Sequence, residues 1–323
     1  MMDRRIKVGV GFGLWSMGVP KPETIVRVAE RAEQWGVDSF WLADQIIPRT
    51  PDLDVVAVLS LLASRTTTIK LGPSVLLLNL RHPLLVAKAF ATLDYLSNGR
   101  IVMAVGTGAN LAEYGAFGLP TEGRGARLDE GIQALRTLWR EPKASFHGRF
   151  YNFDNVTLEP RPQPRHNNDF GTIDLWVGGT ADGALKRTAR FADGYFPSLQ
   201  TPAEYAKCWA TIRRYAEQYG RANARIESGI IIFCRLAPSR GQALEEVPRY
   251  LRQFGAVGEQ FISRGAFGTP DDIRECIEAY IKVGLNKFVL SPLAGPDEYA
   301  GQVETIGREI ATPYLKYSPA GER

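Results

Sequence analysis

The chain alternates between short runs of apolar residues and longer stretches in which apolar positions recur with the spacing of a helix. Residues 101–106 are nearly all apolar, as expected for a strand that is covered on both faces. Residues 22–35 instead place Ile25, Val28 and Ala32 on one helical face. These two patterns follow one another along the chain, which predicts a regular alternation of strand and helix.

Applied to the whole chain, the patterns predict eight strands, each followed by one or more helices. The strands are expected at 6–12, 39–43, 69–78, 101–106, 174–177, 194–196, 228–236 and 288–291. The helices are expected at 22–35, 54–65, 83–97, 124–140, 181–191, from 201 onward, and at 242–254, 270–283 and 298–310. Such repetition predicts parallel strands with helical crossovers, and eight strands close a barrel. The expected fold class is therefore α/β, a (β/α)8 TIM barrel, as a single domain over residues 1–323.

The alternation breaks once, between the fourth and fifth strands. Residues 141–172 are rich in proline, asparagine and aromatic residues and show no helical period. The segment is too long for a simple connector, so we expect an excursion, with a small hairpin, over one end of the barrel. An open doubly wound sheet is disfavoured, because no Gly-x-Gly-x-x-Gly motif follows the first strand.

Composition excludes several classes of protein. The formal charge of +4 is small for 323 residues and the basic residues are scattered, which disfavours nucleic-acid binding. No apolar stretch reaches membrane-spanning length and no apolar leader follows the N-terminus, so a cytoplasmic protein without membrane contact is expected. The cysteines and histidines lie far apart without metal-ligand spacing, so we expect no metal: Cys208, Cys234, Cys276, His82, His147 and His166.

In a barrel of this kind, function lies at the carboxyl ends of the strands. Two glycine-rich turns are expected there, Gly106, Thr107 and Gly108 after the fourth strand, and Gly178, Gly179 and Thr180 after the fifth. Glycine lets the backbone approach a ligand, and free N–H groups at a helix start bind phosphate. Two such turns on adjacent strands predict a phosphate-bearing cofactor.

Few side chains at this end carry obvious chemistry. Asp44 directly follows the second strand, with Gln45 next to it. A catalytic role for Asp44 and a structural role as an N-cap or in a loop salt bridge are equally open. Trp15, in the first loop, is the tryptophan placed to line a substrate pocket. His82 precedes Pro83 at a helix start, where a structural role is expected.

Several motifs resemble those of the luciferase-like monooxygenase superfamily, in the same order and over nearly the whole chain. They are IKLGPSV at 69–75, RHP at 81–83, AKAFATLD at 87–94, LSNGR at 96–100, VGTG at 105–108, LWVGG at 175–179, ADG at 192–194 and GTPDD at 268–272. Within the superfamily, AFATL at 89–93, VGTG and GLNKF at 284–288 are most similar to the branch that uses the deazaflavin coenzyme F420.

The resemblance implies where a cofactor lies. Family members hold a tricyclic ring at the barrel mouth, against a bulged third strand that often contains a non-prolyl cis peptide. In this chain that position corresponds to Ser74 and Val75. Members of the family usually pair through helices on the barrel flank, which implies a homodimer. The apolar run at 55–62 exceeds what one buried helix face requires and agrees with that expectation.

This chain departs from the sugar-phosphate dehydrogenases of the F420 branch at three positions. Those enzymes have Asp-His after strand 2, where Asp44 and Gln45 stand here. They have a glutamate after Gly-Thr-Gly, where Ala109 stands, and a lysine after strand 6, which residues 198–200 lack. The usual acid–base and phosphate-binding groups are therefore missing, and a sugar phosphate is disfavoured as the substrate.

Three hypotheses follow. The first is an F420-dependent oxidoreductase that transfers hydride between the deazaflavin and a small alcohol, imine or activated alkene. The second is an FMN-dependent monooxygenase that uses oxygen. The third is a catalytically inactive barrel that binds a ligand or partner. Asp44 and Gln45 are the candidate catalytic residues, and Asp44, Ser74, Val75 and the two glycine turns are the candidate cofactor-binding residues.

Overall fold

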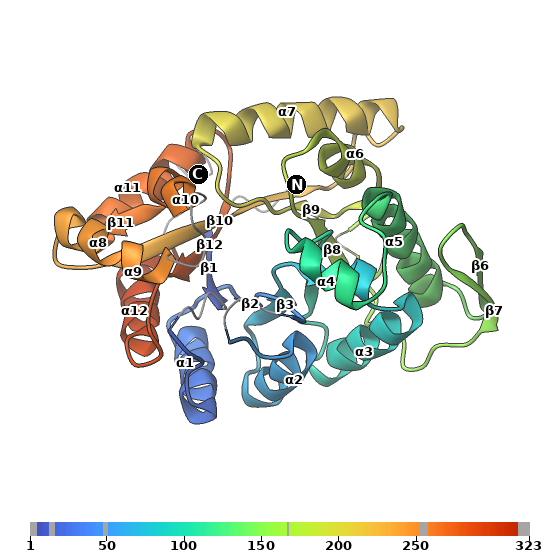
Figure 1. Ribbon diagram of the computed structural model, residues 1–323, viewed down its shortest axis with the longest axis horizontal. Helices are drawn as coiled ribbons and strands as arrows, with labels where there is room; N and C mark the ends of the chain where they lie inside the picture. The colour runs from blue at the N-terminus through green and yellow to red at the C-terminus, as the bar shows by residue number, and fades with distance from the viewer. Residues whose placement is uncertain (1–4, 13–16, 48–50, 167, 252–257, 316–323) are drawn as a thin grey trace, which may run out of the picture.

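Eight parallel strand positions form a nearly closed barrel surrounded by helices (Figure 1). The computed structural model describes residues 5–12, 17–47, 51–166, 168–251 and 258–315. The barrel strands are β1 Lys7–Phe12, β2 Ser39–Leu42, β3 Lys70–Pro73 with β4 Leu76–Leu77, β5 Val102–Gly106, β8 Asp174–Val177, β9 Gly194–Tyr195, β10 Glu227–Leu236 and β12 Lys287–Pro292. Their order is β3-β2-β1-β12-β10-β9-β8-β5-β4. The predicted TIM barrel is confirmed.

The third strand position is divided into β3 and β4, where the sequence predicted one strand over 69–78. β3 pairs with β2, and β4 pairs with β5, so together they join the two ends of the sheet. An isolated parallel bridge between Leu71 and Ile101 links them further. Residues 78–80 then form a short 3-10 helix, η1 Leu78–Leu80.

Helices follow the strands, and most of them cover the outside of the barrel. They are α1 Pro22–Gln34, α2 Val55–Arg65, α3 Pro83–Leu96, α4 Leu111–Ala116, α5 Arg124–Arg140, α6 Asp182–Phe191, α7 Pro202–Gln218, α8 Arg240–Glu246, α9 Pro248–Leu251, α10 Gly258–Arg264, α11 Pro270–Ile281, α12 Tyr299–Thr305, the π-helical η3 Ile306–Ala311 and α13 Thr312–Leu315. Local signals mark several starts. Thr201 and Thr269 each open a helix with a capping box and a proline in the first turn.

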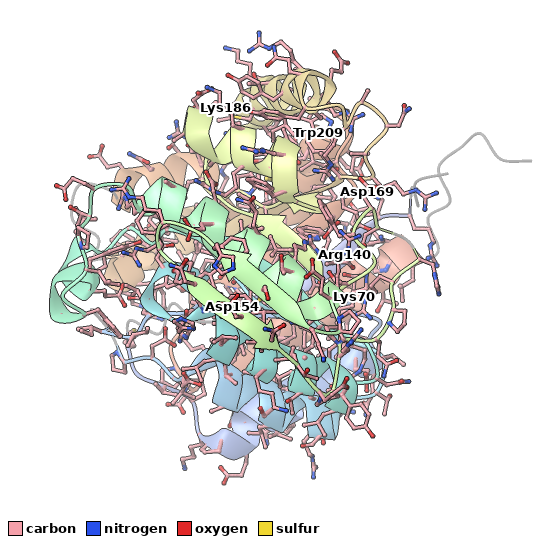
Figure 2. The ribbon with its side chains drawn as sticks, turned by 90° about the vertical axis from the view of Figure 1, so that its right-hand side faces the viewer. Lys70, Arg140, Asp154, Asp169, Lys186 and Trp209 are labelled. Carbon is pink, nitrogen blue, oxygen red and sulfur yellow. The ribbon has the colours of Figure 1, made fainter. Side chains whose placement is uncertain are left out.

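The irregular segment at 141–172 contains an antiparallel hairpin, β6 Ala144–His147 and β7 Asn152–Val156. The hairpin packs against α5 on the outer side of the barrel, where Figure 2 shows it with Asp154 labelled. The sequence had placed it over one end of the barrel. The reason is a carboxylate on α5: Glu130 accepts hydrogen bonds from the backbone N–H groups of residues 149–151 and holds the hairpin turn to the flank.

Large apolar side chains fill the barrel. Trp41 and Trp176 are both buried, with ring centroids 5.9 Å apart, and Phe196 packs against both. Val75 packs on this cluster from the third strand. The interior is therefore a packed core, and a site has to be built on the loops at its carboxyl end.

Candidate active site

Ser74 and Val75 are the two half-exposed residues in an otherwise buried segment, 71–80. The peptide bond between them is cis, as the family resemblance implied. The Ser74 N–H donates to the carbonyl of Leu42 at the end of β2. The third strand thus exposes only Ser74 and Val75 at the carboxyl end of the barrel.

Both predicted glycine turns flank Val75. β5 and β8 are neighbours, and the Gly178 N–H donates to the carbonyl of Val105. A Cβ on Gly106 would lie 2.6 Å from one Val75 methyl, and a Cβ on Gly178 would lie 3.1 Å from the other. These glycines therefore have a packing role that the sequence did not indicate, since they leave room for Val75.

The remaining residues of the two turns leave backbone donors unused. Gly108 and Gly179 have φ of +75° and +104°, which favours glycine. Within the described chain, the N–H groups of Thr107, Gly108, Gly179 and Thr180 donate to no protein acceptor. Unused donors at two neighbouring turns, the second at the start of α6, fit the oxygen atoms of a phosphate.

Asp44 is buried at the end of β2 and bonds to the protein through both carboxylate oxygens. Arg81 donates to Oδ2 at 2.6 Å and to Oδ1 at 2.9 Å, and the Leu77 N–H donates to Oδ2 at 2.8 Å. Burial raises the pKa of Asp44 above its usual value, and the Arg81 charge and the two donors offset only part of that rise. The structure therefore shows the loop salt bridge that was one of the two predicted alternatives. Its catalytic or cofactor-binding role stays a prediction.

Helix α4, which the sequence analysis missed, connects the two sides of the mouth. Asn110 caps the helix, and the buried Glu113 carboxylate accepts from the N–H groups of Ile46 and Ile47 at 2.7 and 3.0 Å. The asparagine and the glutamate three residues later were a recognisable helix-start signal. This glutamate positions the loop after β2, and so does not replace the one missing at Ala109.

A hydroxyl network fixes the first glycine turn. The Tyr114 hydroxyl donates to the Thr107 carbonyl at 2.5 Å and accepts from the Asn79 side chain at 2.9 Å. Burial raises the pKa of Tyr114, so the phenol keeps the proton that it donates. Asn79 also donates to the Arg124 carbonyl, and its buried Oδ1 accepts no hydrogen bond from the part of the chain that the structure describes.

Gln45 lines a cavity of about 430 Å³ beside the mouth. The cavity is open to one side and lies between the loop after β2, the end of η1 and the residue after α4. Among the described residues, its walls are Gln45, Ile46, Asp52, Asp54, Leu80, Arg81 and Phe117. Asp52 and Phe117 were not identified from the sequence, because no local motif marks them. Trp15, the predicted pocket residue, lies outside the described residues.

The predicted structural residues have the expected places. His82 caps α3 through its Nδ1, which accepts from the Leu84 N–H. His147 and His166 are exposed, and His147 lies 3.0 Å from Asp154. Among the described residues there is no cluster of three or more metal-ligating side chains. In the same part of the chain, each helix is too short or too polar to span a membrane.

Comparison with known proteins identifies the family. A family model described as luciferase-like monooxygenase matches residues 6–265. The chain belongs to this family. The family expected from the motifs is therefore confirmed.

Relatives in the luciferase-like family include enzymes with assigned cofactors. An F420-dependent glucose-6-phosphate dehydrogenase of Kineococcus radiotolerans is 31% identical over 248 residues, covering 74% of this chain and 71% of the relative. The enzyme of the same name from Amycolatopsis mediterranei is 28% identical and covers 96% of this chain and 99% of the relative.

Solved structures show the same fold. An F420-dependent secondary alcohol dehydrogenase, in complex with an F420-acetone adduct, matches with a TM-score of 0.83 at 20% identity, covering 97% of this chain and all of that one. The monooxygenase RslO1 from Streptomyces bottropensis matches with a TM-score of 0.81 at 22% identity, covering 96% and 100%.

Proposed function

We propose that the protein is an F420-dependent oxidoreductase that transfers hydride between the deazaflavin and a small organic substrate. The observation that carries the proposal is the pair of glycine turns on β5 and β8, which flank Val75 and present unused backbone donors. The names of two similar relatives support F420 as the cofactor. The alternative cofactor is FMN, with oxygen as the co-substrate.

Each part of the mouth has a task in this proposal. Ser74 and Val75 would contact the ring, and the N–H groups of residues 107–108 and 179–180 would hold its phosphate. The cofactor would supply a hydride acceptor or donor at C5 of its ring. The chain contributes binding, orientation and exclusion of water. Asp44 contributes indirectly, because its bond to Leu77 fixes the strand that carries Val75.

The charges beside the mouth argue against a phosphorylated substrate. The walls of the cavity there include two carboxylates, on Asp52 and Asp54, and the cation of Arg81, which is already paired with the buried Asp44. At the turn after β9, the buried Gln200 bonds to Tyr195 and Cys208 and adds no positive charge. We therefore favour an uncharged alcohol, imine or activated alkene.

Titration of the purified protein with F420 and with FMN tests the cofactor assignment. We expect F420 to bind more tightly, as measured by the change in its fluorescence. Gly179→Asp adds a side chain and a negative charge at the proposed phosphate site, and should weaken F420 binding at least about tenfold, or ~1.4 kcal/mol.

Gly220→Asp is a matched control, since Gly220 also has a positive φ, of +73°, and lies after α7 with open space around it. It should bind F420 like the wild type. Unchanged F420 affinity in a folded Gly179→Asp protein would show that the phosphate binds at another place. Tighter binding of FMN would favour the monooxygenase, and failure to bind either cofactor would favour an inactive barrel.

A further inference from the structure

The cavity beside the mouth contains a carboxylate with an unsatisfied oxygen. Oδ1 of Asp52 accepts from the Leu53 N–H at 2.8 Å, whereas Oδ2 is buried and has no hydrogen-bond partner among the described residues. Buried carboxylate oxygens are normally bonded, because an unpaired one costs free energy. Oδ2 therefore lacks the hydrogen bond that a buried carboxylate oxygen normally has, and the Asp52 side chain has to turn before a molecule in the cavity can supply one.

Two neighbouring carboxylates, Asp54 in the cavity wall and the buried Asp44 paired with Arg81, are already engaged. Asp44 uses both oxygens on Arg81 and Leu77. Asp54 is exposed, caps α2 through the Ala57 N–H, and lies 3.7 Å from Arg81. Asp52 is thus the acid in this cavity that combines burial with a vacant oxygen.

The surroundings of Asp52 bring its pKa close to neutral pH, where a carboxyl group can both take up and release a proton. Burial raises its pKa to about 7, the Asp44 charge adds to the shift, and the Leu53 N–H opposes it. The cation nearest these acids, Arg81, is paired with Asp44 and lies near Asp54. A group that titrates near neutral pH is what general acid–base catalysis requires, and Gln45 cannot supply one.

The cavity is connected to the strand that carries the proposed ring-binding residues. Arg81 lines the cavity and holds Asp44, and Asp44 binds the N–H of Leu77, two residues after Val75. The cavity therefore lies on the side of the barrel mouth where the third strand carries Ser74 and Val75.

We propose that Asp52 is the proton-exchanging residue of the reaction, acting on the hydroxyl of an uncharged alcohol or on the carbonyl of its product. The inference rests on the proposed function. In oxidation, the O–H bond breaks and its proton passes to Asp52 Oδ2, while the C–H bond breaks and hydride leaves for the deazaflavin. The O–H electron pair becomes the second bond of the carbonyl. In reduction, protonated Asp52 returns the proton to the carbonyl oxygen as hydride arrives.

A second cavity shows that a cavity alone does not indicate a catalytic site. It measures about 450 Å³ and lies between the end of β10 and α12. Its buried Arg235 bonds to Glu246, Glu298 and the Leu293 carbonyl, and Gln302 bonds to the backbone of Leu236 at both ends of its amide. These polar side chains are satisfied within the protein, unlike Asp52.

The experiment combines a direct titration with kinetics on two matched variants. Asp52→Asn keeps the size and the acceptor for Leu53 but cannot exchange the proton. Asp154→Asn removes an exposed carboxylate from the hairpin on the barrel flank, outside the cavity, so it is the control. Infrared spectroscopy of the protein without cofactor should show a carboxyl group that titrates near pH 7 in the wild type and in Asp154→Asn, and is lost in Asp52→Asn.

Turnover is then measured with F420 and a panel of uncharged aliphatic alcohols. Asp52→Asn should lower kcat by roughly 10²-fold or more and remove the limb of the pH profile near 7, with F420 affinity unchanged. Absence of the titrating carboxyl in the wild type would overturn the inference even if the variant failed to fold. Wild-type turnover in an Asp52→Asn protein that binds F420 would overturn it and leave the proposed function intact. Failure of the wild type to bind F420 would overturn both.

Discussion

At Asp44, one carboxylate joins three segments that are distant in the sequence: the end of β2, the Leu77 backbone in β4, and Arg81 before α3. The side chain of Asp44 is 2% exposed and that of Arg81 is 17% exposed. The position of this acid after a strand was evident from the sequence. Its partners were not, because no local pattern relates residues more than thirty positions apart. The geometry makes Asp44 a positioning residue for the strand that carries Ser74 and Val75.

Asp44→Asn tests that role. The change leaves Arg81 with a weaker partner, so we expect a loss of unfolding free energy of roughly 1–3 kcal/mol, measured by chemical denaturation. F420 binding should weaken, because Leu77 and the neighbouring Val75 are held less firmly. Hydride transfer in a single turnover with saturating cofactor should stay close to wild type. Normal cofactor affinity together with lost single-turnover transfer would instead assign Asp44 a direct catalytic role.

At the scale of elements, glutamates on three helices each bind a neighbouring loop through backbone N–H groups. Glu33 on α1 binds residues 67–69, Glu113 on α4 binds residues 46–47, and Glu130 on α5 binds residues 149–151. Strands and helices were predictable from local periodicity, which reports burial of each segment. The division of the third strand, helix α4 and the position of the hairpin depend on such long-range contacts, so local periodicity could not predict them.

The variant Glu33→Gln tests how much one of these contacts contributes to the free energy of unfolding, and how that contribution depends on pH. Burial alone would raise the pKa of Glu33, yet the N–H groups of residues 67–69 and the Thr68 hydroxyl lower it to about 2. Because the pKa in the folded state lies below 4.5, the stabilisation is complete above pH 4.5 and is lost as the pH falls through 2. The free energy of unfolding of the variant should be lower than that of the wild type by on the order of 1–3 kcal/mol at neutral pH, and by less toward pH 2.

The comparison needs a surface control on the same helix. Glu30 pairs with Arg65 at 2.8 Å and both side chains are partly exposed, so Glu30→Gln should change stability by less than about 1 kcal/mol. Chemical denaturation of all three proteins across pH 2 to 7 gives the result. A difference between wild type and Glu33→Gln that did not vary with pH would contradict the assignment.

At the scale of the whole molecule, the two ends of the barrel differ in how far their polar groups are paired within the protein. At the amino end, the buried Lys287 pairs with Asp38 at 2.5 Å and lies over the rings of Trp41 and Trp176. These charges are paired and enclosed, which suits a role in stability. At the carboxyl end, backbone donors of the two glycine turns and one Asp52 oxygen have no hydrogen-bond partner in the described residues. That asymmetry is the reason for locating both binding and chemistry at the carboxyl end.

The flank formed by α2 and α3 is the molecule's candidate dimer surface. The two helices pack side by side (Figure 1), and four of their apolar residues are exposed: Leu61, Leu85, Tyr95 and Leu96. Leu85 and Leu96 are eleven residues apart, so they lie on the same side of α3, about 16 Å apart along its axis. Exposed leucines at both ends of one side of α3, together with Leu61 on α2, suit a surface that binds a partner, and the homodimer predicted from the sequence would cover them.

Light scattering on the purified protein tests the dimer. At micromolar concentration we expect twice the mass of the chain for the wild type and the mass of one chain for Leu85→Glu with Leu96→Glu. Two buried glutamates at a symmetric interface would face their copies, and their desolvation would not be offset by any opposite charge. Leu85 is 71% exposed and Leu96 is 60% exposed, so the double variant should fold normally. Ile262→Glu, at an exposed residue of α10, should remain a dimer. A wild-type mass of one chain would contradict the prediction, and a dimeric double variant would place the interface on another face of the barrel.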